Sequence, residues 1–339
     1  MYEEFFGLRE KPFTLLADPS FLYLSRKHAT ALSLLEYALS GQAGFCVITG
    51  EVGSGKTTLL RQFLQEVDAR TTPGVIFQTH RDFGDILRWV LLAFGIEPKS
   101  DDRTQLYQNF LDFLIDQRTA GRRTILIVDE AQNLSVQALE ELRLLSNVNF
   151  DKFLFLQIIL VGQPELLEKL RLPELRQFAQ RVAVHYDLGP LTAEETRNYI
   201  AHRMRIAGAQ APVFNDWAVA AIYYFTQGVP RLINSLCDMA LVYAFADGRK
   251  LVDLEIVSAV VADREASGLM VFAKSVLGQD EESLRAQLSP LVSAAQLQEE
   301  ASAAVKGPQA LASPFDEDED RPLTEAGPPA PAALGKRAR

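Results

Sequence analysis

Three glycines, a lysine and a threonine near residue 50 have the spacing of a phosphate-binding loop. The pattern G-x-x-x-x-G-K-[ST] is met at every required position by Gly50-Glu51-Val52-Gly53-Ser54-Gly55-Lys56-Thr57, and Thr58 follows. In such a loop the glycines let backbone N–H groups face phosphate oxygens, the lysine reaches the β- and γ-phosphates, and the threonine hydroxyl ligates Mg²⁺. The alternative is a glycine-rich turn that binds nothing.

The residues on either side of the loop decide between these interpretations. Residues 44–49 are short, apolar and partly β-branched, which predicts a buried strand. Residues 56–68 carry leucine, phenylalanine and valine at helical spacing. A glycine-rich loop between a strand and a helix N-terminus is suited to bind phosphate. We therefore predict a nucleotide site that binds ATP with Mg²⁺.

Two acidic residues follow a second apolar strand pattern. Residues 124–129 are almost entirely apolar and end in Asp129, and Glu130 comes next. The carboxyl ends of parallel strands open toward the ligand in such sheets. We expect Asp129 to hold Mg²⁺ together with Thr57, and Glu130 to orient and deprotonate the attacking water. An acidic turn is the alternative, but together with the loop the pair predicts an ATPase.

Four further residues are candidates for contact with the γ-phosphate. Gln163 follows the apolar run 153–161, where it would sense the γ-phosphate or hold the water rather than serve only in a turn. Arg231 follows Pro230, which suits the first turn of a helix, and would reach the phosphates from a folded lid. Arg176 and Arg181 either favour the end of their own helix or reach a neighbouring subunit's nucleotide.

Alternating strand and helix patterns occupy residues 44–188, which is typical of a three-layer αβα domain with a parallel sheet. The predicted strands are 44–49, 74–79, 124–129, 153–161 and 182–187. The predicted helices are 56–68, 82–94, 102–118, 135–147 and 164–180, with an earlier helix at 25–40.

A second, all-helical region follows, beginning with Thr192 and Glu195 in capping-box spacing. The predicted lid helices are 192–207, 215–226, 230–246 and 253–263, and an amphipathic segment covers 281–305. The expected domains are an N-terminal segment 1–43 packed on the ATPase core, a P-loop αβα domain 44–190, a helical lid 191–265, a weakly helical extension 266–305, and an acidic Pro/Ala-rich disordered tail 306–339.

Composition limits the class of protein and its location. The formal net charge of −10 argues against a constitutive nucleic-acid binder. Two cysteines give no disulfide framework, and four scattered histidines lack metal-ligand spacing. The N-terminus lacks a signal-peptide pattern, and no apolar run reaches 18 residues. We expect a soluble cytoplasmic protein without a transmembrane segment, or one peripheral to the inner membrane through a partner.

The combination of motifs resembles a known family. The residues that carry the resemblance are Phe6-Gly7-Leu8, Pro12-Phe13, Asp18-Pro19, Phe21-Leu22-Tyr23-Leu24, the loop 50–57, Asp129-Glu130-Ala131-Gln132, Gly162-Gln163-Pro164-Glu165-Leu166, Arg181 and Gly228-Val229-Pro230-Arg231. Over residues 2–265 they look like the AAA+ ATPases of the general secretion pathway protein A (ExeA-like) family. The resemblance implies sheet order 5-1-4-3-2, a helical lid and a homo-oligomeric ring or open ring. It further implies that Gln163 is the first sensor, Arg231 the second, and Arg181 the arginine finger, with Arg176 in reserve.

The resulting expectation is an AAA+ ATPase that drives or switches a protein assembly step in a secretion, pilus or exopolysaccharide export system. Its partner would be a protein of that system. Two alternatives remain open at this point. One is an ATP-dependent DNA-binding regulator of transposition, and the other is a slowly hydrolysing, nucleotide-gated scaffold.

Overall fold

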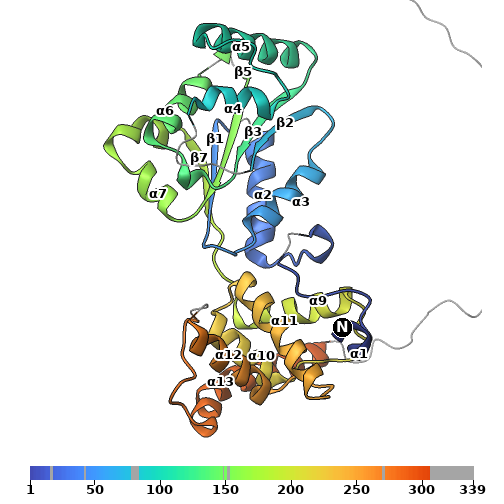
Figure 1. Cartoon of the computed structure of the whole chain (residues 1–339). Coiled ribbons are helices and arrows are strands. Elements are labelled where there is room, and N and C mark those ends of the chain that lie inside the picture. Colours follow the sequence, from blue (N-terminus) through green and yellow to red (C-terminus); the bar gives the residue numbers. More distant parts are fainter. Residues whose placement is uncertain are drawn as a thin grey trace, which may run out of the picture. The chain divides into compact units, whose positions relative to one another are not determined.

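The computed structural model describes residues 1–15, 18–41, 43–77, 84–147, 149–150, 153–268 and 272–305 (Figure 1). The chain divides into two units, Met1–Gln296 and Leu297–Arg339. The sequence-based expectation for the tail 306–339 lies outside the described residues.

A parallel sheet of five strands carries the loop and the acidic pair. Its strands are β1 (Phe45–Thr49), β2 (Thr71–Ile76), β3 (Arg123–Val128), β6 (Gln157–Gly162) and β7 (Val182–Asp187). The spatial order is β2-β3-β6-β1-β7, with every neighbouring pair parallel. This is the predicted order 5-1-4-3-2 read from the opposite edge, so the predicted topology is confirmed.

Helices cover both faces of this sheet, because its central strands are apolar on both sides. Leu126 and Val128 of β3 pack into one apolar cluster, while Ile125 and Ile127 pack into another. The first cluster includes α4 (Ile86–Ala93), α5 (Arg103–Thr119), α6 (Val136–Leu145), α7 (Glu165–Leu170) and α8 (Arg176–Ala179). The second includes α2 (Arg26–Ser40) and α3 (Lys56–Glu66). The predicted αβα layering is therefore correct.

Prolines explain two differences from the predicted boundaries. β2 begins at Thr71 rather than at residue 74 and includes Pro73, which is tolerated because β2 is an edge strand. The predicted end of this strand and start of the next helix fall at residues 78–83, outside the described residues. The predicted helix 164–180 is wrong as a single helix, because Pro173 starts a separate 3₁₀ turn, Pro173–Leu175, between α7 and α8.

The predicted strand 153–161 is divided. Phe153–Leu154 forms β5, which pairs antiparallel with β4 (Asn149–Phe150), and β6 begins only at Gln157. In the main sheet Gln157 pairs with Ile125, two residues after the start of β3, and Ile158 pairs with Phe45, the first residue of β1. Apolar composition alone does not distinguish these two pairings.

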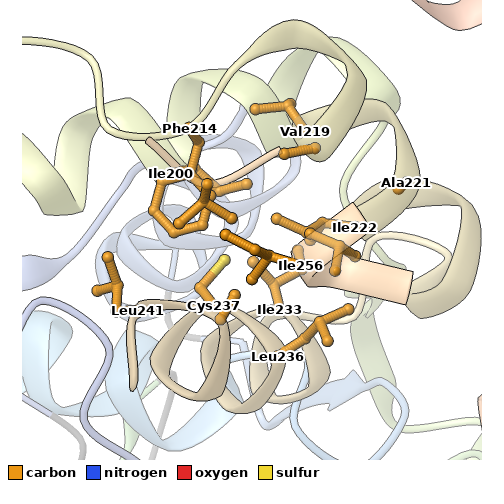
Figure 2. Packing of buried hydrophobic residues seen from close by; sticks show 14 of the residues in the cluster. Ile200, Phe214, Val219, Ala221, Ile222, Ile233, Leu236, Cys237, Leu241 and Ile256 are labelled. Atoms are coloured by element: carbon orange, nitrogen blue, oxygen red, sulfur yellow. The ribbon is translucent and has the colours of Figure 1, made fainter. Parts of the chain in front are cut away.

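The second region is a helical lid whose apolar faces share one cluster (Figure 2). Its helices are α9 (Ala193–Ile206), α10 (Asp216–Thr226), α11 (Pro230–Ala246) and α12 (Leu254–Ser267). The Thr192/Glu195 capping box is present at the start of α9. A further helix, α13 (Glu281–Val305), buries Leu284, Leu288 and Val292 in the same cluster. The lid therefore has its own hydrophobic core.

The N-terminal segment differs from the expectation that residues 1–43 pack on the ATPase core. Its first part, which contains α1 (Tyr2–Phe6), buries Tyr2, Leu8, Phe13 and Phe21 in the lid cluster instead. The backbone of this part is also bound to the lid, since the Arg9 N–H donates to the Ala207 carbonyl at 2.7 Å. Within the part of residues 1–43 that the structure describes, it is α2 that packs on the sheet. The apolar residues of the leader predicted burial, but their pattern did not indicate which domain they join.

None of the helices within the described residues combines the length and the apolar character that crossing a membrane requires.

Candidate functional site

The glycine-rich loop links β1 to α3, as the motif requires. Gly53 and Gly55 have φ values of 82° and 99°, in the left-handed region that favours glycine. Their surroundings also exclude a side chain. A Cβ on Gly53 would lie 2.3 Å from the Arg231 Cβ, and one on Gly55 would lie 2.8 Å from the His28 Nε2. The loop is thus held in its turn conformation by contacts from the lid and from α2.

Lys56, the first residue of α3, is only 6% exposed. Its Nζ donates hydrogen bonds to the carbonyl oxygens of Gly50 at 2.6 Å and Glu51 at 2.9 Å. Burial lowers the pKa of Lys56, and the nearby Glu130 and Asp129 carboxyl groups oppose that shift. The ammonium group is therefore held inside the loop, next to the two acids.

The tips of β3 and α3 meet at Thr57 and Asp129. The Thr57 hydroxyl donates to Asp129 Oδ2 at 2.9 Å, and the Glu130 N–H donates to Asp129 Oδ1 at 2.9 Å. Asp129 is 2% exposed, and burial raises the pKa of its carboxyl group against the opposing effect of the Thr57 hydrogen bond. A hydroxyl and a carboxylate side by side are the oxygen ligands that Mg²⁺ prefers.

Glu130 is held by two amide side chains. Its backbone is left-handed, with φ 54°. Gln132 donates from Nε2 to Glu130 Oε2 at 2.6 Å, and Gln163 donates from Nε2 to the same oxygen at 3.3 Å. The Gln163 N–H in turn donates to Gln132 Oε1 at 3.0 Å. The structure thus brings Gln163 beside Glu130, and it adds Gln132, which sequence reasoning did not assign to the site.

A cavity of about 400 Å³ lies over the loop. That volume is within the usual range for small-molecule sites, about 300–1,000 Å³. Its lining includes six of the predicted loop residues, namely Val52, Gly53, Gly55, Lys56, Thr57 and Thr58. Glu130 and Arg231 also line it, and the Arg231 N–H donates to the Gly53 carbonyl at 3.2 Å. Gly50, Glu51 and Ser54 contribute the carbonyl oxygens bound by Lys56 and His28.

The cavity residues that were not predicted from the sequence include His28, Tyr199, Arg203 and Asn234. The Arg203 guanidinium donates from Nε to the Pro12 carbonyl at 2.5 Å and from Nη1 to the Tyr199 hydroxyl at 2.8 Å. The Tyr199 hydroxyl donates to Asn234 Oδ1 at 2.7 Å. These groups join the leader to α9 and α11 at one end of the cavity. In the sequence, the sign of these contacts is a polar residue on the apolar face of a helix, because a buried polar group needs a hydrogen-bond partner.

The two arginines proposed as fingers lie elsewhere. Arg176 begins α8 and is exposed, and Arg181 is exposed directly before β7. The Arg181 Nη1 donates to Ser146 Oγ at 3.1 Å, at the end of α6. Neither residue lines the cavity of its own chain.

The residues present fit a nucleoside triphosphate with Mg²⁺. Arg231 and His28 lie so close to Gly53 and Gly55 that these positions have no room for a side chain, which leaves the loop backbone free to approach phosphate. Lys56, Arg231 and the N-terminus of α3 supply positive charge. The described residues contain no group of three His, Cys, Asp or Glu side chains able to hold a metal by themselves. Mg²⁺ at this position would be held by Thr57 and Asp129 together with phosphate oxygens.

The burial of His28 makes a pH-dependent contribution to stability. His28 is 4% exposed, and burial lowers the pKa of its imidazole below the ordinary value of 6.5. Between the ordinary pKa and the lowered pKa of the folded protein, the unfolded chain binds more protons than the folded chain. The free energy of unfolding therefore falls as the pH falls. We expect the melting temperature to drop between about pH 7 and about pH 5, and to drop less in His28→Gln protein. Calorimetry at several pH values measures both slopes. Equal slopes for the two proteins would contradict the expectation.

The chain is similar to known proteins in sequence and in fold. Residues 39–170 match a family model described as an AAA domain. The chain is 41% identical to general secretion pathway protein A of Aeromonas hydrophila over 249 residues, which are 73% of this chain and 46% of that protein. The chain thus spans about half the length of the curated relative it matches.

Two solved structures share the fold at low identity. The ORC2 protein of Aeropyrum pernix, in ADPNP and ADP complexes, has a TM-score of 0.56 and 18% identity, covering 78% of this chain and 74% of that chain. Cdc6p from Pyrobaculum aerophilum has a TM-score of 0.57 and 16% identity, covering 84% and 90%. At these identities the similarity concerns the fold alone.

Proposed function

Because the chain belongs to the AAA+ family that includes general secretion pathway protein A, we propose that it binds ATP with Mg²⁺ and hydrolyses the nucleotide to ADP and phosphate. The observation that carries the proposal is the contact between Thr57 Oγ1 and Asp129 Oδ2 at 2.9 Å, with Glu130 next to Asp129. It joins the glycine-rich loop to an acid pair, and hydrolysis needs both.

Each residue has a role in this reaction. The N–H groups of the loop and the Lys56 ammonium bind the phosphates, and Arg231 adds a positive charge from the lid. Thr57 and Asp129 would hold Mg²⁺, which would neutralise charge on the phosphate oxygens. Glu130 accepts a proton from the attacking water, and Gln163, which donates to Glu130, orients that carboxylate and the water. The loop residues Gly50 to Thr58 thus bind the substrate, while Glu130, Gln163 and Arg231 act on the transferring group.

Removing the metal should stop turnover. In the proposed mechanism Mg²⁺ neutralises the phosphates together with Lys56 and Arg231, so chelation with EDTA should reduce phosphate release to background, and added Mg²⁺ should restore it. Thr57→Val protein, which keeps its shape and loses the hydroxyl, should need a higher Mg²⁺ concentration for half-maximal rate. A malachite-green phosphate assay over a Mg²⁺ titration measures both effects. Full activity in EDTA would contradict the metal role.

We propose further that hydrolysis switches a protein assembly step in an export system of the cell envelope. Support comes from the identity to a general secretion pathway protein. In this proposal the chain is a homo-oligomer that acts in the cytoplasm, or at the inner membrane through a protein partner. Its substrate is then a protein of secretion, pilus or exopolysaccharide export rather than nucleic acid.

A genetic complementation experiment in the native host tests this assignment. Deletion of the gene should block assembly or export of one envelope component, and the wild-type gene should restore it. Genes encoding Lys56→Ala or Glu130→Gln should fail to restore it at equal protein levels. Normal export after deletion, or rescue by both variants, would contradict the proposal.

A further inference from the structure

We propose that His28 is a positioning residue of the phosphate-binding loop, which aims the Gly55 N–H at the phosphates by binding the Ser54 carbonyl. The inference rests on the proposed nucleotide site. It gives the peptide unit between Ser54 and Gly55 a hydrogen-bond partner outside the motif. His28 lies on α2, 26 residues before Ser54, and lines the cavity with Gly55 and Lys56.

The hydrogen bonds of the ring fix its tautomer. His28 Nε2 lies 3.1 Å from the Ser54 carbonyl oxygen, which can only accept, so this nitrogen carries the proton and donates. Nδ1 lies 2.7 Å from Ser25 Oγ and therefore accepts from that hydroxyl. Burial, which lowers the pKa of His28, favours the same neutral form. The ring thus presents one fixed N–H to the loop.

The position of that N–H controls the peptide unit between Ser54 and Gly55. A trans peptide is planar, so its carbonyl and its N–H point in opposite directions. The imidazole binds the Ser54 carbonyl, so the Gly55 N–H must point away from the ring. Loss of the donor removes this constraint. A reversed peptide unit would turn a carbonyl oxygen toward the phosphates, where like partial charges repel.

The loop needs such a contact because of its glycines. Gly55 has φ 99°, and glycine rotates between backbone conformations at low cost. The imidazole also occupies the space that a Cβ on Gly55 would need, with a separation of 2.8 Å. The same ring therefore both requires glycine at this position and restrains it.

The ring is itself well anchored. Ser25 caps the N-terminus of α2, accepting from the His28 N–H at 3.3 Å. The following Arg26 N–H donates to Glu195 Oε1 of the lid at 3.1 Å. Glu195 also completes the capping box of α9. The start of α2 is thus fixed by the side chain of Ser25 and by that of Glu195 from the lid, which makes it a firm support for the loop.

Two substitutions of similar size separate positioning from packing. In His28→Gln the amide nitrogen is the same number of bonds from Cα as Nε2, so the donor to Ser54 is kept. In His28→Asn the amide reaches only the Nδ1 position, and the donor is lost. Leu35→Ala, a fully buried change on the same helix, controls for destabilisation.

The measurement is affinity for a fluorescent ATP analogue, followed by kcat at saturating ATP. We expect His28→Gln to bind within about twofold of wild type and His28→Asn to bind about tenfold more weakly, with kcat nearly unchanged in both. Leu35→Ala should lower the melting temperature without weakening binding. If His28→Asn fails to fold, Ser25→Ala replaces it. We expect binding about threefold weaker there, because the ring loses its orienting partner.

Three results would overturn the inference. Equal affinity in wild type, His28→Gln and His28→Asn would show that the donor to Ser54 has no role. Equal weakening in Leu35→Ala and His28→Asn would show a packing effect only. Wild-type protein that does not bind ATP would overturn this inference together with the proposed function, whereas a wild type that binds and hydrolyses ATP leaves the proposed function intact.

Discussion

Glu130→Gln protein should bind ATP with nearly wild-type affinity and hydrolyse it about 10²–10⁴-fold more slowly, the usual contribution of a general base. The amide has the shape of the carboxylate and keeps an oxygen for the hydrogen bonds from Gln132 and Gln163. It has no basicity, so the attacking water keeps its proton. Because the residue does not hold the phosphates in the proposed mechanism, ground-state binding should survive.

The experiment compares single-turnover hydrolysis with equilibrium binding of ATP. Lys56→Ala is the matched comparison, since it removes a phosphate ligand and should lose binding as well as turnover. Gln132→Ala adds a second comparison. It removes the amide that donates to Glu130 at 2.6 Å, the shorter of the contacts from Gln132 and Gln163, and should lower kcat with little change in binding. An unchanged hydrolysis rate in Glu130→Gln would show that another group activates the water.

The core of the site was predictable because its signals are local. The loop motif needs a strand before it and a helix after it, and all three lie within about 20 consecutive residues. Asp129 and Glu130 directly follow an apolar run, and parallel strands open at their carboxyl ends toward one edge. The contact between Thr57 and Asp129 follows from these two patterns and the sheet order.

Contacts between distant segments were not predictable in the same way. His28 and Arg203 read as ordinary helix residues, and their roles depend on Ser54 and Pro12, which are 26 and 191 residues away. The aromatic leader was expected on the core and packs in the lid cluster, because any apolar surface of suitable shape can bury such side chains. Local pattern predicts which residues are buried, while the partner is set by tertiary packing.

The boundaries of helices and strands show the same limit at one proline but not at another. Pro73 lies within β2 because the strand is at the sheet edge, and edge position is a property of the assembled sheet. Pro173, by contrast, ends a helix through its own missing N–H, so that break could have been predicted from sequence.

Arg181→Ala protein should bind ATP nearly normally and hydrolyse it about 10³–10⁵-fold more slowly, if Arg181 completes the site of a neighbouring subunit. The motivation is its position. Arg181 is exposed at the start of β7, does not line its own cavity, and is held through Ser146 Oγ at 3.1 Å. An arginine that reaches a neighbour's nucleotide stabilises charge on the transferring phosphoryl group without being needed for binding.

Mixing two inactive variants gives the decisive measurement. An Arg181→Ala subunit keeps its own loop, and it receives an intact Arg181 from a Lys56→Ala neighbour in a mixed oligomer. ATPase activity should therefore return on mixing and peak at intermediate ratios, while each variant alone stays inactive. Arg176→Ala is the matched control, since Arg176 lies five residues before Arg181 at the start of α8. If mixed oligomers form and no activity returns, Arg181 is not a finger in trans. Recovery with Arg176→Ala in its place would assign that role to Arg176.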